Sequence, residues 1–355
     1  MKKSILKVIV LTLILSFCFS SGVLASGESN ELTSSGYSFK WSLFTTFGPE
    51  DASICYIWPK LFDEIKQRTK GQLDISIYWD GQHPYKGEDF LKVVKEGTAE
   101  LVHLSAGYIT STEPVLGFFA LPVVLSDESM ERFNAEAAMW GNFEQKDGFL
   151  ENILKNKWEA VTVHGIPGCW IRLFTKGYKA DGIGSLKGHK IRVFSPELAK
   201  FVEILGGTPV SISYGEVYTA LTTGLIDGAI TTLQVANAAG WLDQCDTINL
   251  WNLIAYMDST VVSIKALNEL PDDIKKIFLD VMRTSAQKPE MLELYRESML
   301  LEEKITEGYS LYVPDDVLKA TVREKIMEQV IEPWLDSTGD SGKKAFEELE
   351  KITKN

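Results

Sequence analysis

Between residues 184 and 233 the apolar positions alternate between a repeat of two residues, typical of strands, and one of about 3.6 residues, typical of helices. This pattern predicts a strand–helix–strand–helix–strand unit. The unit opens with a short β-branched run at 190–194 that is typical of a buried strand. Ser195 and Pro196 then suit the N-cap and the first position of a helix. The apolar stripe of this helix comprises Leu198, Phe201, Val202 and Leu205.

The second half of this unit repeats the same order. Residues 209–212 predict a strand, and Ser213 and Glu216 have the spacing of a capping box that opens the next helix. Gly224 and an Asp-Gly turn are expected to end that helix. Its apolar face comprises Val217, Leu221 and Leu225. Such alternation predicts an α/β fold with parallel-dominated sheets, in which ligands bind at the carboxyl ends of the strands.

The rest of the chain continues this pattern. Strands are expected at 39–44, 73–79 and 101–104, and helices at 53–70 and 87–97. An apolar run at 117–125 is expected in the core, followed by a helix capped by Ser126 that carries Met130, Phe133 and Ala137. After Trp158, two strands separated by a Gly-Pro-Gly break indicate the crossing into a second domain. Residues 272–308 and 314–351 are predicted to be helical, with their charged residues on a solvated face.

Arg192 is the leading candidate for ligand binding. It stands at the end of a predicted strand and just before a helix N-terminus, where unpaired N–H groups and the helix dipole favour anions. A guanidinium adds a bidentate donor that matches a carboxylate. An arbitrary strand arginine is more often paired with an acid at the surface, but this position favours an anionic ligand.

Residues that follow other strands are further candidates. Thr45 and Phe47 follow the first predicted strand, and Tyr108 follows the third, so that all three are expected at a carboxyl edge. Trp241 lies on the helix after the 184–233 unit. Turn formation and core packing are the simpler alternatives for these residues, and packing is favoured for Trp241.

The 184–233 unit resembles the signature of the solute-binding subunits of tripartite ATP-independent periplasmic (TRAP) transporters. The matching segments are SLKGHKIR, GGTPV and EVYTALTTGLIDG, in the family's order and spacing. Weaker matches in TKGQLDISIYWDGQ, VKEGTAEL and EPVLGFFALPVVL extend the resemblance over most of the chain. The resemblance implies capture of a small organic acid outside the cytoplasm, no cofactor, and transient delivery to a two-part TRAP permease.

The resemblance also implies an architecture. We expect a two-lobe α/β fold like that of type II periplasmic binding proteins, with a ligand cleft between the lobes and a long helix spanning both. Lobe I is expected at residues 26–167 and 258–297, and lobe II at 168–257 and 298–355. Thr231 fills a slot in which the family often has a polar, ligand-facing residue. Phe194, the last residue of the strand that carries the signature arginine, is a further candidate for ligand binding.

A second arginine that many family members carry is out of register here. The family slot falls on Ile171, so Arg172 is expected to point away from the cleft, because a shift of one residue turns a strand side chain to the opposite face. Trp170 is a candidate for a flat apolar wall instead. The string HGIPG resembles an H-G-P-G variant branch of the family. The ligand is therefore expected to be a short dicarboxylate or a monocarboxylate with an apolar or aromatic body.

The N-terminus predicts export. Lys2, Lys3 and Lys7 precede an apolar run at 8–19 and a small-residue site ending at Ala25, which is the pattern of a cleaved signal peptide at residues 1–25. Lipid attachment at Cys18 is disfavoured by the bulky Phe17 before it. A periplasmic protein that is not embedded in the membrane is expected.

Charge and composition weigh against other classes of function. The chain has 36 Lys and Arg residues against 49 Asp and Glu, and loss of the three signal lysines brings the net charge near −16, which disfavours nucleic acid as a partner. Its four histidines, His83, His103, His164 and His189, form no ligand-spaced pair, so no metal or catalytic site is expected, and His164 is interpreted as a satisfied structural residue. An exported hydrolase remains the alternative. Cys55, Cys169 and Cys245 allow at most one disulfide, and the pairing is left open.

Overall fold

The computed structural model describes residues 36–50, 53–122, 135–141, 147–167, 170–254, 257–284 and 290–353. Contacts group residues 34–355 into one compact unit, and its strands form two sheets. The expected signal peptide, the helix capped by Ser126 with Met130 and Phe133, and Cys169 lie outside the described residues.

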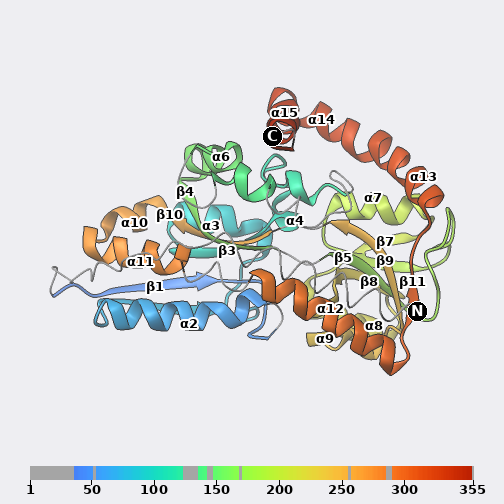
Figure 1. The fold of residues 1–355 in the computed structure, drawn as a ribbon, viewed down its shortest axis with the longest axis horizontal. Helices are drawn as coiled ribbons and strands as arrows, with labels where there is room; N and C mark the ends of the chain where they lie inside the picture. Colours follow the sequence, from blue (N-terminus) through green and yellow to red (C-terminus); the bar gives the residue numbers. More distant parts are fainter. Residues whose placement is uncertain are drawn as a thin grey trace, which may run out of the picture. The chain divides into compact units, whose positions relative to one another are not determined.

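Sheet A has the strand order β2-β1-β3-β10-β4 (Figure 1). Its strands are β1 (Phe39–Phe44), β2 (Leu73–Tyr78), β3 (Leu101–Ser105), β4 (Ala160–Pro167) and β10 (Met257–Ser263). β1 runs parallel to β2 and β3, whereas β10 runs antiparallel to β3 and β4. The expected parallel character is therefore right for the first three strands only.

Sheet B has the order β11-β9-β5-β8-β6-β7. Its strands are β5 (Ile171–Thr175), β6 (Lys190–Val193), β7 (Thr208–Ser211), β8 (Gly228–Thr232), β9 (Thr247–Ile254) and β11 (Ser310–Tyr312). β6 pairs in parallel with β7 and β8, as the sequence predicts, while β5 runs antiparallel to β8 and β9. The chain passes from sheet A to sheet B between β4 and β5, returns between β9 and β10, and passes to sheet B again between β10 and β11. β11 was not expected, because its three residues lie in the short gap between two segments predicted to be helical.

The helices cover the faces of the two sheets. They are α2 (Ser53–Arg68), α3 (Phe90–Glu96), α4 (Ala106–Ile109), α6 (Phe149–Trp158), α7 (Pro196–Ile204), α8 (Val217–Thr223), α9 (Leu233–Ala238), α10 (Ile264–Glu269), α11 (Asp272–Thr284), α12 (Glu290–Glu307), α13 (Asp316–Ile326), α14 (Glu332–Thr338) and α15 (Asp340–Thr353). Short 3₁₀ turns are η1 (Gly87–Asp89), η2 (Phe118–Ala120), η4 (Tyr214–Glu216) and η5 (Trp241–Asp243), and a π-helical turn, η6 (Met327–Ile331), joins α13 to α14. α12 packs against α9 beside sheet B (Figure 1). It also contacts β4 of sheet A.

The β6–α7–β7–α8–β8 unit forms as its sequence predicts. The Ser195 hydroxyl accepts a hydrogen bond from the Leu198 N–H at 3.3 Å, and the Glu216 carboxylate accepts one from the Ser213 N–H at 3.1 Å. The apolar stripe of α7 is fully buried. Leu225 is an exception, since its side chain is 53% exposed. α8 ends at Gly224, which is left-handed with φ 73°, and the chain leaves the helical period before Leu225.

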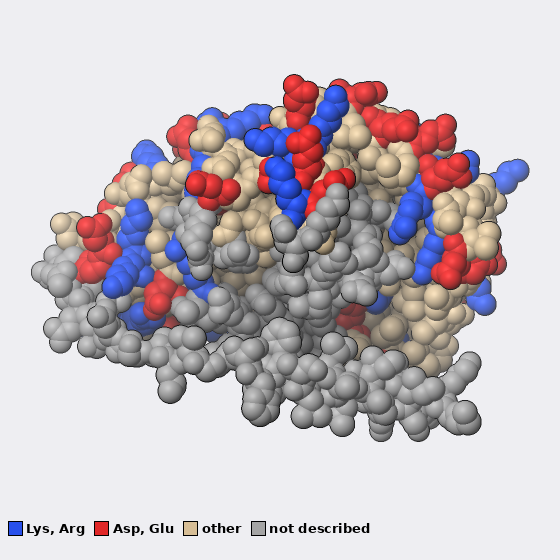
Figure 2. Space-filling model, turned by 45° about the horizontal axis from the view of Figure 1, so that its top comes forward, with Lys and Arg blue, Asp and Glu red and all other residues tan. Residues whose placement is uncertain are grey.

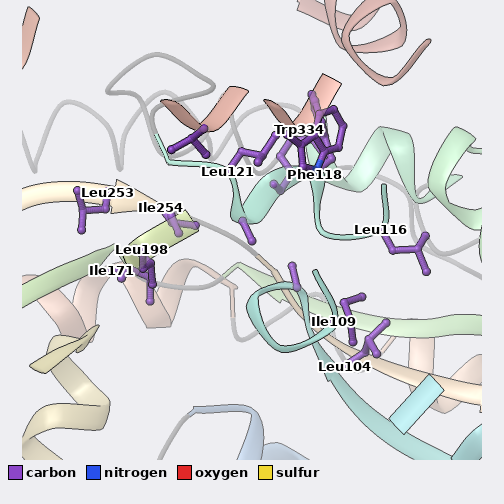
Figure 3. Close-up of a cluster of buried hydrophobic side chains, with 14 of the residues drawn as sticks. Leu104, Ile109, Leu116, Phe118, Leu121, Ile171, Leu198, Leu253, Ile254 and Trp334 are labelled. Carbon is purple, nitrogen blue, oxygen red and sulfur yellow. The ribbon is translucent and has the colours of Figure 1, made fainter. Parts of the chain in front are cut away.

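The largest hydrophobic cluster contains residues from elements of both sheets (Figure 3). Leu104 and Ile109 come from β3 and α4, whereas Leu198 and Ile254 come from α7 and β9. The C-terminal segment joins the same cluster, because α13 packs on α7 and the ring of Trp334 in α14 lies 5.8 Å from that of Phe118, tilted by 46°. Phe346 of α15 meets Phe118 edge to face at 4.9 Å.

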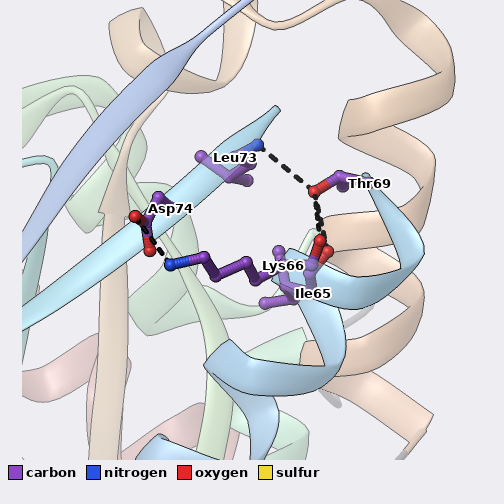
Figure 4. A network of polar contacts seen from close by, with 5 residues as sticks. All are labelled: Ile65, Lys66, Thr69, Leu73 and Asp74. Atoms are coloured by element: carbon purple, nitrogen blue, oxygen red, sulfur yellow. Dashed lines mark hydrogen bonds and ion pairs between the residues drawn. The ribbon is translucent and has the colours of Figure 1, made fainter. Parts of the chain in front are cut away.

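The turn from α2 to β2 shows how local polar contacts fix the start of a strand (Figure 4). The Thr69 hydroxyl donates to the Ile65 carbonyl at 2.8 Å and accepts from the Leu73 N–H at 3.2 Å. An ion pair of 2.9 Å joins Lys66 to Asp74. The hydroxyl thus gives the Ile65 carbonyl a second donor, beside the Thr69 N–H at 2.9 Å, and supplies an acceptor for the N–H at the strand start.

The described surface mixes both signs of charge. On the face drawn in Figure 2, Lys and Arg side chains are interspersed with Asp and Glu. Within the described ranges, no helix combines the length and the apolar composition that crossing a membrane requires.

Glu151 of α6 provides a test of the packing against sheet A. Its buried carboxylate accepts hydrogen bonds from the Thr162 N–H at 3.2 and 3.3 Å, and burial raises its pKa from 4.5 to about 7. The folded state therefore holds a proton that the unfolded state releases above pH 4.5, and stability falls as the pH rises from there to about 7. Glu151→Gln removes this loss, because the amide does not ionise. We therefore expect the difference in free energy of unfolding between variant and wild type to be about 3 kcal/mol more favourable to the variant at pH 8 than at pH 4.5.

Urea unfolding of both proteins across this pH range measures the effect. Glu203→Gln on the exposed face of α7 is the control and should leave the pH dependence unchanged. Parallel pH profiles for wild type and Glu151→Gln would show that the carboxyl group is ionised at no cost in the folded protein.

Candidate functional site

Arg192 is the most deeply buried cation of the candidate site. It lies near the end of β6, with 1% of its surface exposed. Its Nε donates to the Ile212 carbonyl at 3.3 Å, and Nη1 donates to the Ile230 carbonyl at 3.4 Å. Nη2 is buried and has no hydrogen-bond partner, and none of the described carboxylates pairs with this guanidinium. A buried donor and a buried positive charge are both left to be satisfied.

Two aromatic rings flank this guanidinium. Cζ of Arg192 lies 5.3 Å from the ring centroid of Phe194 and 5.5 Å from that of Trp241. The ring faces attract the cation and hold it in one orientation, but they carry no formal negative charge. Trp241, for which packing was favoured, is buried in η5 and also contacts the arginine.

Phe194 connects Arg192 to α4, the helix that follows strand β3 of sheet A. Its ring lies 5.6 Å from the ring of Tyr108 in α4. Gly107 comes so close that a Cβ built on it would lie 2.4 Å from Cε2 of Phe194. The segment after β3 therefore touches the segment after β6, and the carboxyl ends of two strands from different sheets face each other here.

A second line of rings connects Trp241 to sheet A. Its ring lies 5.6 Å from that of Tyr214, which in turn lies 5.9 Å from the ring of Phe47. Phe47 packs at 4.9 Å from His103 of β3. Arg192, Phe194, Tyr108, Trp241 and Phe47 are thus linked by direct contacts, with Tyr214 as a connection that the sequence did not indicate.

Thr45, His103 and Asp258 form a buried polar row behind Phe47. The Thr45 hydroxyl lies 3.3 Å from Nδ1 of His103, and Nε2 of His103 lies 3.1 Å from the Asp258 carboxylate. The same hydroxyl accepts from the Phe47 N–H at 3.2 Å, and Thr45 is fully buried. Although the order of groups is that of a hydrolytic triad, the hydroxyl is enclosed and bonded to its own loop. The row fixes the backbone of Phe47 and does not present a nucleophile.

Thr231 and Arg172 lie on the same face of sheet B as Arg192. Arg192 is paired with Ala229 on β8, and Thr231, two residues further along that strand, is paired with Arg172 on β5. Residues paired across neighbouring strands share a face, and residues two apart on one strand do so as well. The expectation that Arg172 points to the opposite face is therefore wrong. It came from counting residues back from Lys187-Gly188, and such a count does not capture the pairing of β5 with β8.

Arg172 differs from Arg192 in having an acidic partner. Its Nη1 forms an ion pair with Glu297 of α12, and its Nε donates to the Asn252 side-chain oxygen at 3.1 Å. Asn252 adopts a left-handed φ of 49°, where the ladder between β5 and β9 shifts register. Glu297 is buried, contrary to the expectation that the charged residues of this helix form a solvated face.

The remaining expected residues have simpler surroundings. Trp170 is buried directly before β5. His164 is buried on β4, but both of its ring nitrogens lack a partner among the described residues, so the expectation of a satisfied histidine is wrong. Burial lowers its pKa to about 3, which keeps the ring neutral. Cys55 and Cys245 are buried and are not joined by a disulfide.

Neither a metal centre nor its ligands emerge from the described part of the chain, in which no three His, Cys, Asp or Glu residues gather closely enough to hold an ion. The arrangement instead suits an anion at Arg192. Sequence reasoning missed Tyr214, His103, Asp258 and Glu297. For Tyr214 a signal existed, because it follows β7 at the same carboxyl edge, whereas the others reach the site through contacts between distant elements.

Comparison with known proteins identifies relatives over most of the chain. Residues 56–334 match the family model of the bacterial extracellular solute-binding protein, family 7. A solute-binding protein of Sulfitobacter sp. is 27% identical over 250 residues, which cover 70% of this chain and 73% of that protein. An uncharacterized protein of Salmonella typhimurium is 25% identical over 179 residues, 48% of this chain and only 50% of that protein's length.

Solved structures share the fold at lower identity. An extracytoplasmic solute receptor of Bordetella pertussis binding pyroglutamic acid superposes with a TM-score of 0.78 at 19% identity, covering 88% of this chain and 100% of that one. A TRAP periplasmic solute-binding protein of Roseobacter denitrificans with bound β-D-glucuronate gives 0.77 at 19% identity, covering 89% and 99%. With a family model that matches most of the sequence and a two-lobe fold in common, this chain belongs to family 7 of the bacterial extracellular solute-binding proteins, the solute-binding proteins of TRAP transporters.

Proposed function

We propose that this protein captures a small organic acid outside the cytoplasm and delivers it to the membrane subunits of a TRAP permease. The observation that carries the proposal is the Arg192 guanidinium, which is buried between two rings with one N–H group unsatisfied. A carboxylate supplies both missing elements at once, a negative charge and an acceptor oxygen. Receptors with this fold bind pyroglutamic acid and glucuronate, which are both carboxylic acids, and this supports the chemical class.

Other residues take distinct roles in this proposal. Tyr108 and Thr231 hydrogen-bond the acid, while Phe47, Phe194, Trp170 and Trp241 bound its body. Thr45 acts indirectly, because its hydroxyl is already engaged by His103 and by the Phe47 N–H. The ligand is a short dicarboxylate or a monocarboxylate with an apolar or aromatic body, depending on the state of Arg172.

Capture requires the two sides of the site to approach each other. We assign lobe I to residues 26–167 and 258–297 and lobe II to residues 168–257 and 298–355, with hinge motion at the passages between the sheets. Residues 1–25 are removed after Ala25 on export to the periplasm, and the loaded receptor contacts its permease transiently. The contacts between α4 and Phe194 belong to the closed arrangement.

Substitution of Arg192 tests the clamp. For Arg192→Ala we expect affinity for the acid that co-purifies with the wild type to fall by roughly 100-fold or more, because the carboxylate would be buried without its partner. Arg192→Lys should not restore binding, since an ammonium lacks the planar pair of donors. Native mass spectrometry identifies the bound acid, and isothermal titration calorimetry then measures its affinity.

Arg68→Ala is the control, because Arg68 forms surface ion pairs with Glu64 and Asp280 at the end of α2. Its affinity should equal that of wild type. An affinity within threefold of wild type in Arg192→Ala, or a co-purifying ligand without a carboxylate, would refute the clamp.

Gly107→Ala tests the closed contact. The added methyl group would overlap the Phe194 ring at 2.4 Å, so the ring must move away from the arginine or the two segments must separate. We expect affinity for the co-purifying acid to drop by about tenfold with little loss of stability. Gly182→Ala is the matched control, because no atom lies within 4 Å of its Cβ position. Equal affinities of the two variants would show that this contact is not part of the bound state.

A further inference from the structure

Two arginines border β8 on one face of sheet B. Arg192 on β6 and Arg172 on β5 lie on either side of this strand, offset by two residues along it. Strand spacing and rise put their backbones about 12 Å apart, so both side chains are within reach of one small molecule. A pair of guanidinium groups at such a distance can hold the two ends of a dicarboxylate.

The chain itself supplies an acid to one of them. Arg172 and Glu297 are 6% and 5% exposed and form an ion pair, and Asn252 takes the Nε hydrogen of the arginine. Arg192 has carbonyl partners only and retains an unsatisfied Nη2. Of these two cations on one face, one is neutralised by the protein and the other is not.

Glu297 is buried on an otherwise exposed stretch of α12, so its ion pair with Arg172 is not a chance contact of a surface carboxylate. Its neighbours Arg296, Ser298 and Met299 are exposed on α12, whereas Glu297 turns inward. α12 packs on α9 and on β4, so the helix is fixed against elements of both sheets while it presents the carboxylate to β5. The acid is therefore held in place by packing that does not depend on a ligand.

We propose that Glu297 determines selectivity by occupying Arg172 as an internal carboxylate, so that the site accepts solutes with one carboxylate and rejects dicarboxylates. This inference rests on the proposed function, because it takes Arg192 as the clamp for the single acid group. A second ligand carboxylate would have to lie beside Glu297, where like charges repel, or displace it from Arg172 and leave it buried without a partner. Either route costs affinity for the diacid and leaves binding of the monoacid unchanged.

Matched probes differing by one carboxylate test this selectivity. The pairs are D-glucuronate with D-glucarate and hexanoate with adipate, each titrated calorimetrically into ligand-stripped protein. For wild type we expect every pair that binds to favour the monoacid by roughly 100-fold. In Glu297→Gln the negative charge is gone while the shape is kept, so the ratio should shift toward the diacid by at least about tenfold.

A double variant guards against a purely structural role of the ion pair. Arg172→Met with Glu297→Leu replaces the pair by apolar side chains of similar size, which is often neutral or stabilising. It should unfold no more easily than wild type and keep monoacid affinity within about threefold. Loss of monoacid binding in this folded variant would show that Arg172 itself holds the ligand and would overturn the proposal.

The remaining outcomes separate the two levels of inference. Wild-type preference for a diacid, or an unchanged ratio in Glu297→Gln, overturns the role of Glu297 and leaves the Arg192 clamp standing if Arg192→Ala abolishes binding of the same probes. If Glu297→Gln does not fold, the wild-type preference and the double variant decide the matter. If no acid binds to wild type at all, the proposed function fails together with this inference.

Discussion

A positive charge that is withdrawn from water and left without an anion is the constraint around which this site is built. Arg192 is held by two carbonyl oxygens and two ring faces, which orient the guanidinium but do not neutralise it. The local fold enforces this position, because β6 ends where the Ser195 cap begins α7 and the side chain has no route to the surface. The buried guanidinium is energetically unfavourable without an anion, so an anionic ligand gains affinity by neutralising it.

Aromatic residues connect the arginine to distant parts of the structure. Phe194 and Trp241 touch the arginine, and through Tyr108, Tyr214 and Phe47 the contacts continue to loops that follow strands of sheet A. The polar row behind Phe47 in turn holds its loop against β3 and β10. A change at the guanidinium therefore alters the packing of residues from both sheets, and the proposed hinge closure would use this coupling.

Features set by neighbouring residues were predictable from the sequence. β1, the Ser195 cap, the capping box at Ser213 and the buried stripe of α7 all follow from local spacing, and Arg192 follows from its place before a helix. Features set by distant partners were not. β11 forms because three residues pair with β9, and the orientation of Arg172 is decided by the pairing of β5 with β8. In the sequence Glu297 does not differ from the other acidic residues of its helix, and only the packing of α12 against the sheets brings it to Arg172.

The C-terminal segment has a mechanical consequence for the proposed hinge motion. α13 packs on α7 beside sheet B, whereas Trp334 and Phe346 pack on Phe118, which follows β3 and α4 of sheet A. The chain already passes between the sheets three times, before β5, before β10 and before β11, so this segment adds a fourth covalent connection. Connections at several separated points restrict rotation between two bodies, so the C-terminal helices would limit the angle of the hinge motion proposed above.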